Sequence, residues 1–474
     1  MKNVDIAVIG SGIGGSLISA LNKNKDLILF EKDKNLGGCA STFKRNAAYF
    51  NAGATTFVGY ENNHPIKNIF DEVGVIPNIV ESKVAIRTIQ NKKIVDRVAN
   101  FEEFLTNLNN VYYHKNNRFF WKTIKDIDEK FWKLKNIYYA KYSFKAYTKT
   151  SFCIAELIKE FGLMLFKTAD GFINEVLPNI SKEYKAFIDS QLLITLQTTS
   201  KDLSFLALCL GLAYPFHKVF YSMGGMGQII EDLLKDVNVH NKETIISIQK
   251  EKELYRLIST QNEYLTSKVI LNSAIFESSK LFLDENIKKY YDTFSFSDQS
   301  AFVVYLKLDS KEKFLHHYQI ILKDNIPNCI SNSFFISVSD INDEKLSKDG
   351  YSITISTHSK AIFWEGLTKD EYEEKKEFTQ KFIINEFLNN FENIKQENIK
   401  TIFSATSKTF YRYINRSNCG GKPITAKTIF QLPSCNTPFK GLYNVGDTVF
   451  AGQGWPGVAI GVNVLNKELN NEII

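Results

Sequence analysis

The residues best suited to chemistry form a glycine-rich turn near the start of the sequence. An apolar run leads into Gly-Ser-Gly-Ile-Gly-Gly at residues 10–15, and a helical pattern follows. Gly10 permits a tight turn, Gly12 lets backbone approach a pyrophosphate, and Gly15 lets the helix pack close to the preceding strand. The start of that helix presents free N–H groups and the positive end of its dipole to phosphates.

A carboxylate follows at the spacing that a ribose requires. A second apolar run, residues 27–30, ends at Glu31, about 20 residues after Gly10, where a carboxylate accepts hydrogen bonds from a ribose diol. The same carboxylate disfavours a 2′-phosphate through charge repulsion. Strand, turn, helix, second strand and acid together predict a dinucleotide site rather than an empty βαβ unit. FAD and NAD share this geometry.

The elements that must complete this site come from the other end of the sequence. Residues 441–447 are typical of a strand that ends in Gly446 and Asp447, and residues 452–461 are typical of a glycine-rich turn that opens a further helix. A carboxylate in that position can bond ribityl hydroxyls, and the helix N-terminus can face an electron-rich ring. This second segment favours FAD over NAD.

Two such signals far apart predict an α/β fold with a Rossmann-like FAD-binding domain assembled from discontinuous segments and an inserted α+β substrate domain. We expect the FAD-binding domain to comprise residues 1–85, 215–290 and 400–474. The substrate domain then comprises residues 86–214 and 291–399 and is largely helical in its first part. The periodicity predicts strands near residues 237–240, 244–248, 254–260, 268–274, 301–308 and 351–357, and a helix near residues 369–391.

The bulk properties exclude several classes of protein. A chain of 474 residues is too long for one ordinary core, and a net charge of +6 is too mild for a nucleic-acid binder. None of the six cysteines forms a CxxC pair, so we expect no zinc site, no disulfide framework and a reducing cytoplasm. We expect no signal peptide, and no apolar run reaches the roughly 18 residues of a spanning helix. We therefore expect peripheral contact with the inner face of a membrane at most.

The middle of the sequence is aromatic and basic. One apolar stripe extends from Phe120 to Tyr142 at spacings of three and four, surrounded by lysines. A core stripe with a solvated lysine face is the favoured interpretation, and a basic helix on an anionic membrane is the alternative. Residues 203–216 predict a buried helix or the wall of an apolar channel.

Several further segments complete a resemblance to a known family. Gly37 and Gly38, residues 52–54, the turn at residues 221–227, the strand-like residues 269–274 and the run GLYNVGDTVFAGQGWPGVAIG occur in order along the whole chain. Together with residues 10–15 and Glu31, these segments resemble the FAD-dependent phytoene desaturase and carotenoid isomerase family of the flavin amine oxidase clan. Cys39 stands where many relatives carry arginine, and it resembles the isomerase-like branch.

The resemblance implies an FAD cofactor with its adenosine on Glu31 and its pyrophosphate on residues 12–15. It places Asp447 on the ribityl or phosphate side and residues 454–458 beside the isoalloxazine. The predicted cofactor-binding residues are Gly10, Gly12, Ile13, Gly14, Gly15, Glu31, Lys32, Gly37, Gly38, Gly53, Ala54, Gly446, Asp447, Gly454, Gly457 and Val458. The implied substrate is a long apolar polyene that is drawn from a membrane into an apolar tunnel.

Flavin chemistry on a hydrocarbon requires no obligatory His, Ser or Asp constellation, and the sequence offers none. His217 lies before the turn at residues 221–227, and a structural role is favoured over a catalytic one. Arg412 and Arg416 are assigned structural or solvent roles in the same way. Cys39 either touches the flavin phosphates or is inert.

Three functions are compatible with these patterns. The favoured one is an FAD-dependent oxidoreductase that desaturates a polyene or isomerises it with redox assistance. The second is an amine oxidase-type flavoenzyme that acts on a small amine and surrounds it with an aromatic cage. The third is a non-catalytic protein that holds a lipid on the same fold.

Overall fold

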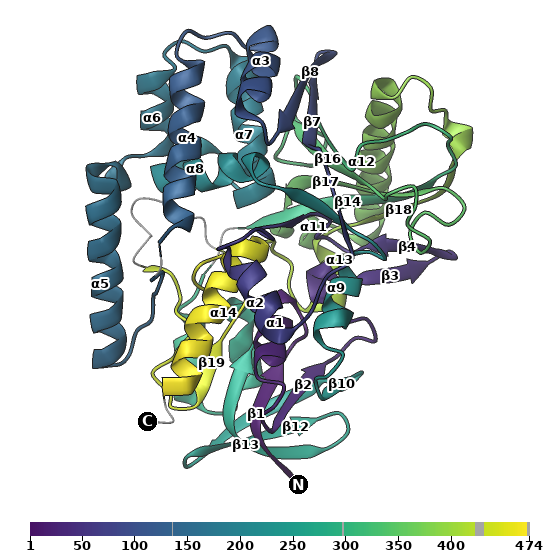
Figure 1. Ribbon diagram of the computed structural model, residues 1–474. Coiled ribbons are helices and arrows are strands. Elements are labelled where there is room, and N and C mark those ends of the chain that lie inside the picture. Colours follow the sequence, from purple (N-terminus) through teal and green to yellow (C-terminus); the bar gives the residue numbers. More distant parts are fainter. Residues whose placement is uncertain (135, 296–297, 422–430, 472–474) are drawn as a thin grey trace.

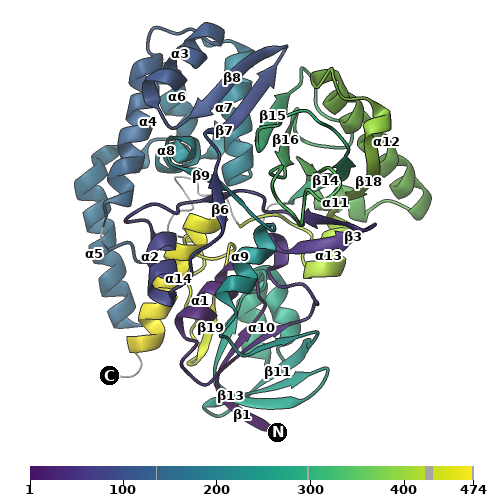
Figure 2. The same cartoon turned by 45° about the vertical axis from the view of Figure 1, so that its right-hand side comes forward.

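The computed structural model of the chain describes residues 1–134, 136–295, 298–421 and 431–471. The first of its two seven-stranded sheets lies at the bottom of Figure 1, and a group of helices and the second sheet lie above it. Figure 2 shows the helices on the left and most of the second sheet on the right, with its last two strands beside the helices. Within the described residues, no helix combines the length and the apolar character needed to span a bilayer.

The first sheet carries the glycine-rich turn and draws its strands from distant parts of the sequence. The strand order is β10, β2, β1, β13, β12 and β11, and β19 pairs with the end of β13 that β12 leaves free. These strands are β1 (Lys2–Ile9), β2 (Leu27–Glu31), β10 (Val239–Asn241), β11 (Ile245–Glu251), β12 (Leu254–Ser259), β13 (Glu263–Leu271) and β19 (Leu442–Asn444). The pairs β1–β2, β1–β13 and β13–β19 are parallel. The predicted α/β fold with a discontinuous Rossmann-like sheet is confirmed.

Alternate residues of the first sheet enter two different cores, as the pleat requires. Val8 and Leu29 point into the core formed with the helices of one face, whereas Ala7 and Phe30 point into the core of the other face. The helices of the first face are α1 (Ile13–Leu21), α2 (Pro65–Val73), α9 (Met226–Leu233) and α14 (Gly454–Asn471); α10 (Glu285–Asp292) covers the second. The start of α1 is thereby held at the carboxyl ends of β1 and β2.

The second sheet is mixed and runs in the order β18, β14, β17, β16, β15, β7 and β8. These strands are β7 (Val84–Gln90), β8 (Lys93–Val98), β14 (Gln299–Leu308), β15 (His317–Ile321), β16 (Ser333–Val338), β17 (Tyr351–Lys360) and β18 (Ile399–Ala405), and α11 (Ala361–Glu365), α12 (Lys369–Asn390) and α13 (Ser407–Ile414) accompany them. The boundaries expected at residues 85 and 400 fall inside β7 and β18, because both strands pair within this sheet. The division into two domains otherwise stays a prediction.

The helical lobe has its own core. Its helices are α3 (Phe101–Val111), α4 (Asn117–Trp132), α5 (Phe144–Phe161), α6 (Ala169–Val176), α7 (Lys182–Leu196) and α8 (Phe205–Ala213). Phe120 and Ile124 of α4 are fully buried, which supports the core interpretation of the apolar stripe. The prediction that the stripe continues to Tyr142 on one helix is wrong, since α4 ends at Trp132 and Tyr142 has a φ of +66°, which a helix cannot contain. The predicted buried helix within residues 203–216 is α8.

Short elements connect these three parts. One small sheet joins β3 (Thr42–Arg45) to β4 (Ala48–Asn51), and another joins β5 (Phe57–Val58), β9 (Val219–Ser222) and β6 (Ile79–Glu81). The 3-10 helices are η1 (Gly38–Ala40), η2 (Gly162–Phe166), η3 (Ser200–Asp202), η4 (Tyr214–Phe216), η5 (Ile275–Leu281) and η6 (Gln396–Asn398). The chain therefore passes repeatedly between the first sheet and the two lobes.

Candidate active site

One cavity of about 1270 Å³ extends from the first sheet into the helical lobe. It is lined by nearly all of the predicted cofactor-binding residues: Gly10, Gly12, Ile13, Gly14, Glu31, Lys32, Gly37, Gly38, Gly53, Ala54, Gly446, Asp447, Gly454, Gly457 and Val458. Gly15 does not line it, because it lies beneath the turn, where a Cβ would come within 2.0 Å of the Gly10 carbonyl oxygen. We call the part around residues 10–14, 31–38 and 446–447 the glycine end.

The glycine-rich turn is shaped to leave backbone donors open to the cavity. Gly10 has a φ of +101°, and Gly12 is the N-cap of α1 with no side chain capping the first N–H groups. A Cβ on Gly12 would lie 2.6 Å from the Asn272 side chain, whose Nδ2 donates to the Gly10 carbonyl oxygen at 3.2 Å. The turn thus presents unpaired N–H groups and no acid in the first turn of α1, which suits a pyrophosphate.

Glu31 joins the two glycine segments of this end. Its Oε2 accepts hydrogen bonds from the backbone N–H of Ser11 at 2.9 Å and from the Ser11 hydroxyl at 2.7 Å. The Ser11 hydroxyl in turn accepts from the N–H of Gly37 at 3.0 Å. Because Ser11 is a variable position inside the glycine motif, spacing alone did not identify it. The Glu31 carboxylate is therefore fixed in direction at the cavity wall before any ligand binds.

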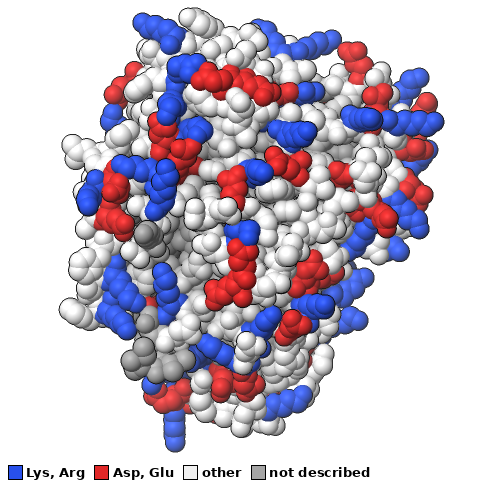
Figure 3. All heavy atoms as spheres, viewed as in Figure 1, with Lys and Arg blue, Asp and Glu red and all other residues white. Residues whose placement is uncertain are grey.

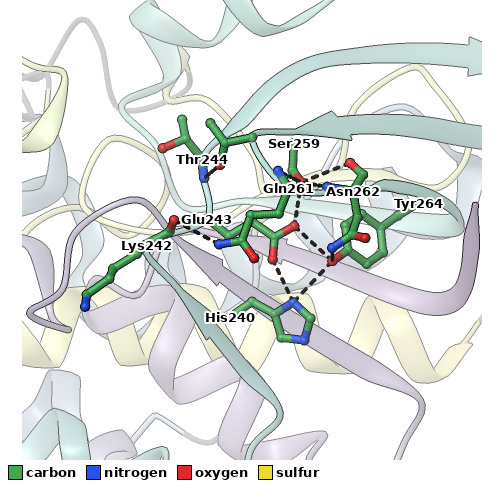
Figure 4. A network of polar contacts seen from close by, with 9 residues as sticks. His240, Lys242, Glu243, Thr244, Ser259, Gln261, Asn262 and Tyr264 are labelled. Atoms are coloured by element: carbon green, nitrogen blue, oxygen red, sulfur yellow. Dashed lines mark hydrogen bonds and ion pairs between the residues drawn. The ribbon is translucent and has the colours of Figure 1, made fainter.

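A second buried carboxylate stands next to Glu31 and escaped the sequence analysis. The backbone N–H of Glu243 donates to the Glu31 carbonyl at 3.0 Å, and Glu243 lines the cavity. Figure 4 shows its carboxylate between His240 at 2.9 Å and the Tyr264 hydroxyl at 2.9 Å, with the Ser259 hydroxyl also donating. Burial would raise the pKa of Glu243, but these hydrogen bonds lower it. The pairing of β10 with β2 brings Glu243 next to Glu31, and no local sequence pattern predicts this pairing.

Asp447 has a buried partner. The Arg416 guanidinium donates to its two carboxylate oxygens at 2.9 and 3.0 Å and also to the Gly420 carbonyl at 2.7 Å. Burial would lower the pKa of Arg416, but the charge of Asp447 raises it. Asp447 keeps 30% of its side chain exposed, at the cavity. This pairing is compatible with the structural role favoured for Arg416, whereas Arg412 is an exposed residue at the cavity edge.

The other part of the cavity is lined mainly by apolar side chains. Phe131 of α4, Ile154 and Leu157 of α5, Leu165 of η2, and Leu206 and Leu210 of α8 line what we call the apolar end. The expectation that residues 203–216 form a buried helix or channel wall is met on both counts, because one face of α8 is packed and the other lines the cavity. This end has few hydrogen-bond partners to offer, so it suits a hydrocarbon ligand.

One polar cluster interrupts the apolar surroundings. His217 holds two carboxylates, through Nδ1 to Glu61 at 3.0 Å and through Nε2 to Asp128 at 2.5 Å. His64 stacks on Trp132 with ring centroids 4.5 Å apart, and its ring lies edge-on to His217 at 5.0 Å. Burial would lower the pKa of His217, but the two carboxylates raise it to about 9; burial and His217 lower the pKa of His64 to about 4.

The cluster lies at the cavity wall, since His64, Asp128, Trp132 and His217 all line it. The two hydrogen bonds of His217 accord with the structural role favoured from the sequence. Asp128 and His64 were missed, because they lie far from His217 in sequence and carry no motif. Cys39 is a free thiol that opens onto the cavity at the glycine end.

The sequence and the fold are similar to those of known proteins. Residues 8–73 match the family described as NAD(P)-binding Rossmann-like domain. Prolycopene isomerase of Daucus carota chloroplasts is 25% identical over 97% of this chain and 78% of its own length. An oxidoreductase from Methanosarcina mazei superposes with a TM-score of 0.64 at 17% identity, covering 98% of this chain and all of its own. Putrescine oxidase, with its substrate bound, superposes with a TM-score of 0.64 at 12% identity and 99% coverage of both chains.

These similarities support a flavin oxidoreductase that resembles carotenoid isomerases and desaturases.

Similarity to these oxidoreductases implies a flavin cofactor, and the glycine end fits one. The open N–H groups at the start of α1 match a pyrophosphate, and the fixed Glu31 carboxylate matches a ribose. The glycines at positions 12 and 14 leave no room for a Cβ, because Asn272 would lie within 2.8 Å of one at either position. The apolar end continues beyond this cradle, as a separate substrate would require.

Proposed function

We propose that the flavin is FAD and that it spans the glycine end of the cavity. Its adenosine ribose would bind Glu31, its pyrophosphate would bind the turn at residues 12–15, and its ribityl chain would lie toward Asp447. The isoalloxazine would lie beside residues 454–458 at the start of α14. The observation that carries this proposal is the single cavity in which the glycine turn, the two carboxylates and the α14 start meet.

We further propose a long apolar polyene as the substrate and either desaturation or redox-assisted cis/trans isomerisation as the reaction. Bound FAD would accept hydride or electrons from the polyene. The chain's own residues would exclude water and hold the polyene along the wall made by Phe131, Leu157, Leu206 and Leu210. The similarity to prolycopene isomerases, which covers 96–97% of this chain, supports the isomerisation branch.

The exposed face of α5 supports peripheral contact with a membrane. Phe144 is 90% exposed and Phe152 is 73% exposed on α5, and Leu163 on the following η2 is 84% exposed. Figure 3 shows uncharged groups projecting from the edge of the molecule that α5 occupies in Figure 1, with lysine and arginine nearby. Ile154 and Leu157 of the same helix line the cavity. A polyene could thus pass along α5 from a bilayer into the apolar end.

Two measurements test the function. The purified protein should be yellow, release FAD on denaturation and show flavin absorption bands; colourless protein that takes up no added FAD would contradict the cofactor. Cells that make poly-cis carotenoids should change their pigments on co-expression of the chain, as read by chromatography. Peroxide release with a panel of amines and unchanged pigments would instead support the amine oxidase alternative.

Membrane contact is tested separately. Wild-type protein should co-sediment with vesicles that contain anionic lipid, and the variant F144S/F152S/L163S should bind at least tenfold more weakly. The control is I246S/I341S/I362S, which removes three apolar residues outside α5 and η2 that are 55%, 58% and 68% exposed. Equal binding by the two variants would overturn the α5 contact and leave the FAD proposal standing.

A further inference from the structure

The cluster around His217 has the composition of a metal site. Glu61, His64 and His217 each offer one ligand atom, and these three atoms lie within 4.8 Å of one another. Two imidazoles and one carboxylate are a set that zinc sites with an open position commonly use. None of the three belongs to the glycine end or to the apolar wall that the proposed function uses.

An unpartnered nitrogen points to a missing ligand. The Nδ1 atom of His64 is buried and has no hydrogen-bond partner, although His64 is only 5% exposed. A buried polar atom without a partner costs free energy, and native structures rarely leave one without a reason. Trp132 stacks on the His64 ring and fixes its plane, so the imidazole is held in place without hydrogen bonds.

Asp128 supplies the outer contact that a metal-bound histidine requires. Metal-ligating histidines almost always donate their second ring N–H to a carboxylate or carbonyl, which fixes the tautomer and the ring direction. The Nε2 atom of His217 is 2.5 Å from Asp128, and Asp128 is itself held by the Trp132 indole at 3.0 Å. The Nδ1 atom of His217 then faces Glu61, 3.0 Å away. The Asp128 carboxylate therefore contacts one ring nitrogen of His217 and leaves the other ring nitrogen facing the ligand site.

We propose that Glu61, His64 and His217 bind one Zn²⁺ ion, with Asp128 orienting His217 from outside. Bonds of about 2.0–2.2 Å require each ligand atom to move inward by less than about 1 Å from its present position. Coordination through His217 Nδ1 replaces its hydrogen bond to Glu61 and gives His64 a partner. The fourth position faces the cavity, because His64 and His217 both line it, and water would fill it.

The ion would join two segments that are far apart in sequence, and Asp128 would connect a third to them through His217. Glu61 and His64 precede α2, His217 follows η4, and Asp128 lies on α4. A bound ion would therefore fasten the helical lobe to the first sheet and would stabilise the folded chain by mass action. The sequence analysis expected no zinc site because it considered cysteine spacing, and this site contains no cysteine.

The test uses tag-free full-length protein that has been treated with chelator and desalted, with its flavin content recorded. Calorimetric titration with ZnCl₂ should give one ion per chain and raise the melting temperature. E61Q and H64Q should each weaken binding by at least about 100-fold, and D128N by about 10–100-fold. H114Q, at a partly exposed histidine outside the cluster, should bind as the wild type does.

Two results would overturn the proposal. One is the absence of stoichiometric Zn²⁺ binding by wild-type protein; the other is equal affinity in E61Q, H64Q and H114Q. Because Glu61 keeps 28% of its side chain exposed, E61Q is expected to fold, and its circular dichroism and melting curve check this. Zinc binding is read without turnover, so its failure is distinct from any failure of the polyene proposal.

Discussion

The two ends of the cavity are built from different parts of the chain. The glycine end uses backbone N–H groups, positive-φ turns and a carboxylate fixed by Ser11, so its shape resides in the main chain. The apolar end uses side chains on α4, α5 and α8, whose backbones are ordinary helices. A main-chain site tolerates almost no added atom, whereas a side-chain site changes its shape with each residue.

This difference has a functional consequence. The main-chain glycine end suits a cofactor, whose shape is constant. The side-chain wall of the apolar end suits a substrate, because substitutions there can adapt it to another molecule. The contrast also yields predictions, because each end should respond differently to substitution.

The largest expected effect is at the glycine end. In G15A, the new Cβ would lie 2.0 Å from the Gly10 carbonyl oxygen, so the turn must shift. We expect the free energy of unfolding to fall by about 3 kcal/mol or more and the bound flavin to be lost. The control G366A places its Cβ no closer than 3.3 Å to a neighbour and should change stability by less than about 0.5 kcal/mol. Denaturant unfolding measures the stability of each variant, and flavin absorbance measures its flavin content. Retained flavin in G15A would contradict the conclusion that the glycine end tolerates no added atom.

The second effect concerns the ion pair of Arg416 and Asp447 at the glycine end. D447A would leave the Arg416 guanidinium, which is 7% exposed, without its carboxylate. Removing one partner of a buried pair lowers the free energy of unfolding by about 3–5 kcal/mol. Because the Asp447 side chain is partly exposed, we expect a loss of about 3 kcal/mol. R412A, which removes an exposed arginine on α13, should cost less than about 0.5 kcal/mol. Urea unfolding of flavin-free protein makes the comparison, and equal losses in both variants would disprove it.

The third effect is a loss of stability at low pH that arises from His317, a buried residue of the cavity wall. His317 lies fully buried in the cavity wall, and burial lowers its pKa to about 3. Between pH 6.5 and 3 the unfolded chain takes up a proton at this position and the folded chain does not, so stability falls as pH falls. Wild type should lose about 2 kcal/mol more than H317Q between pH 7 and pH 5. Parallel urea titrations at the two pH values check the sign; equal losses would show that His317 titrates normally.

The smallest effect belongs to the apolar end and rests on the proposed function. L210F adds volume to the wall, so we expect kcat/KM for the polyene to fall about tenfold while flavin content stays unchanged. L388F, on α12 away from the cavity, is the matched control and should leave turnover per folded molecule unchanged. Pigment chromatography and the flavin spectrum separate the two readouts. Loss of flavin in L210F would show that the two ends are not independent.

The glycine end was predictable from sequence because its requirements are local. Gly10, Gly12 and Glu31 are identified by their spacing. The strand predicted near residues 268–274 is β13, which begins five residues earlier and ends three residues earlier than predicted. Ser11 and Glu243 were not predictable, since the first occupies a variable position and the second arrives through strand pairing.

The apolar end and the second sheet depended on long-range contacts. Residues 399–405 were assigned partly to the FAD-binding domain, yet β18 pairs with β14, nearly a hundred positions earlier. The cluster of Asp128, His64 and His217 comes from three segments that share no motif. Side-chain periodicity indicates that a helix is buried, but it does not say which neighbour or which cavity that helix faces.

The pairing of β13 with β19 has a consequence for biosynthesis. β19 and α14 complete the sheet and the wall beside the turn, and they leave the ribosome more than four hundred positions after β1. At about 5–20 residues per second, tens of seconds separate the two events. During that interval the nascent chain exposes the apolar surface of β13 and α1 that α14 later covers. The strand order therefore leaves this apolar surface uncovered until β19 and α14 have been synthesised.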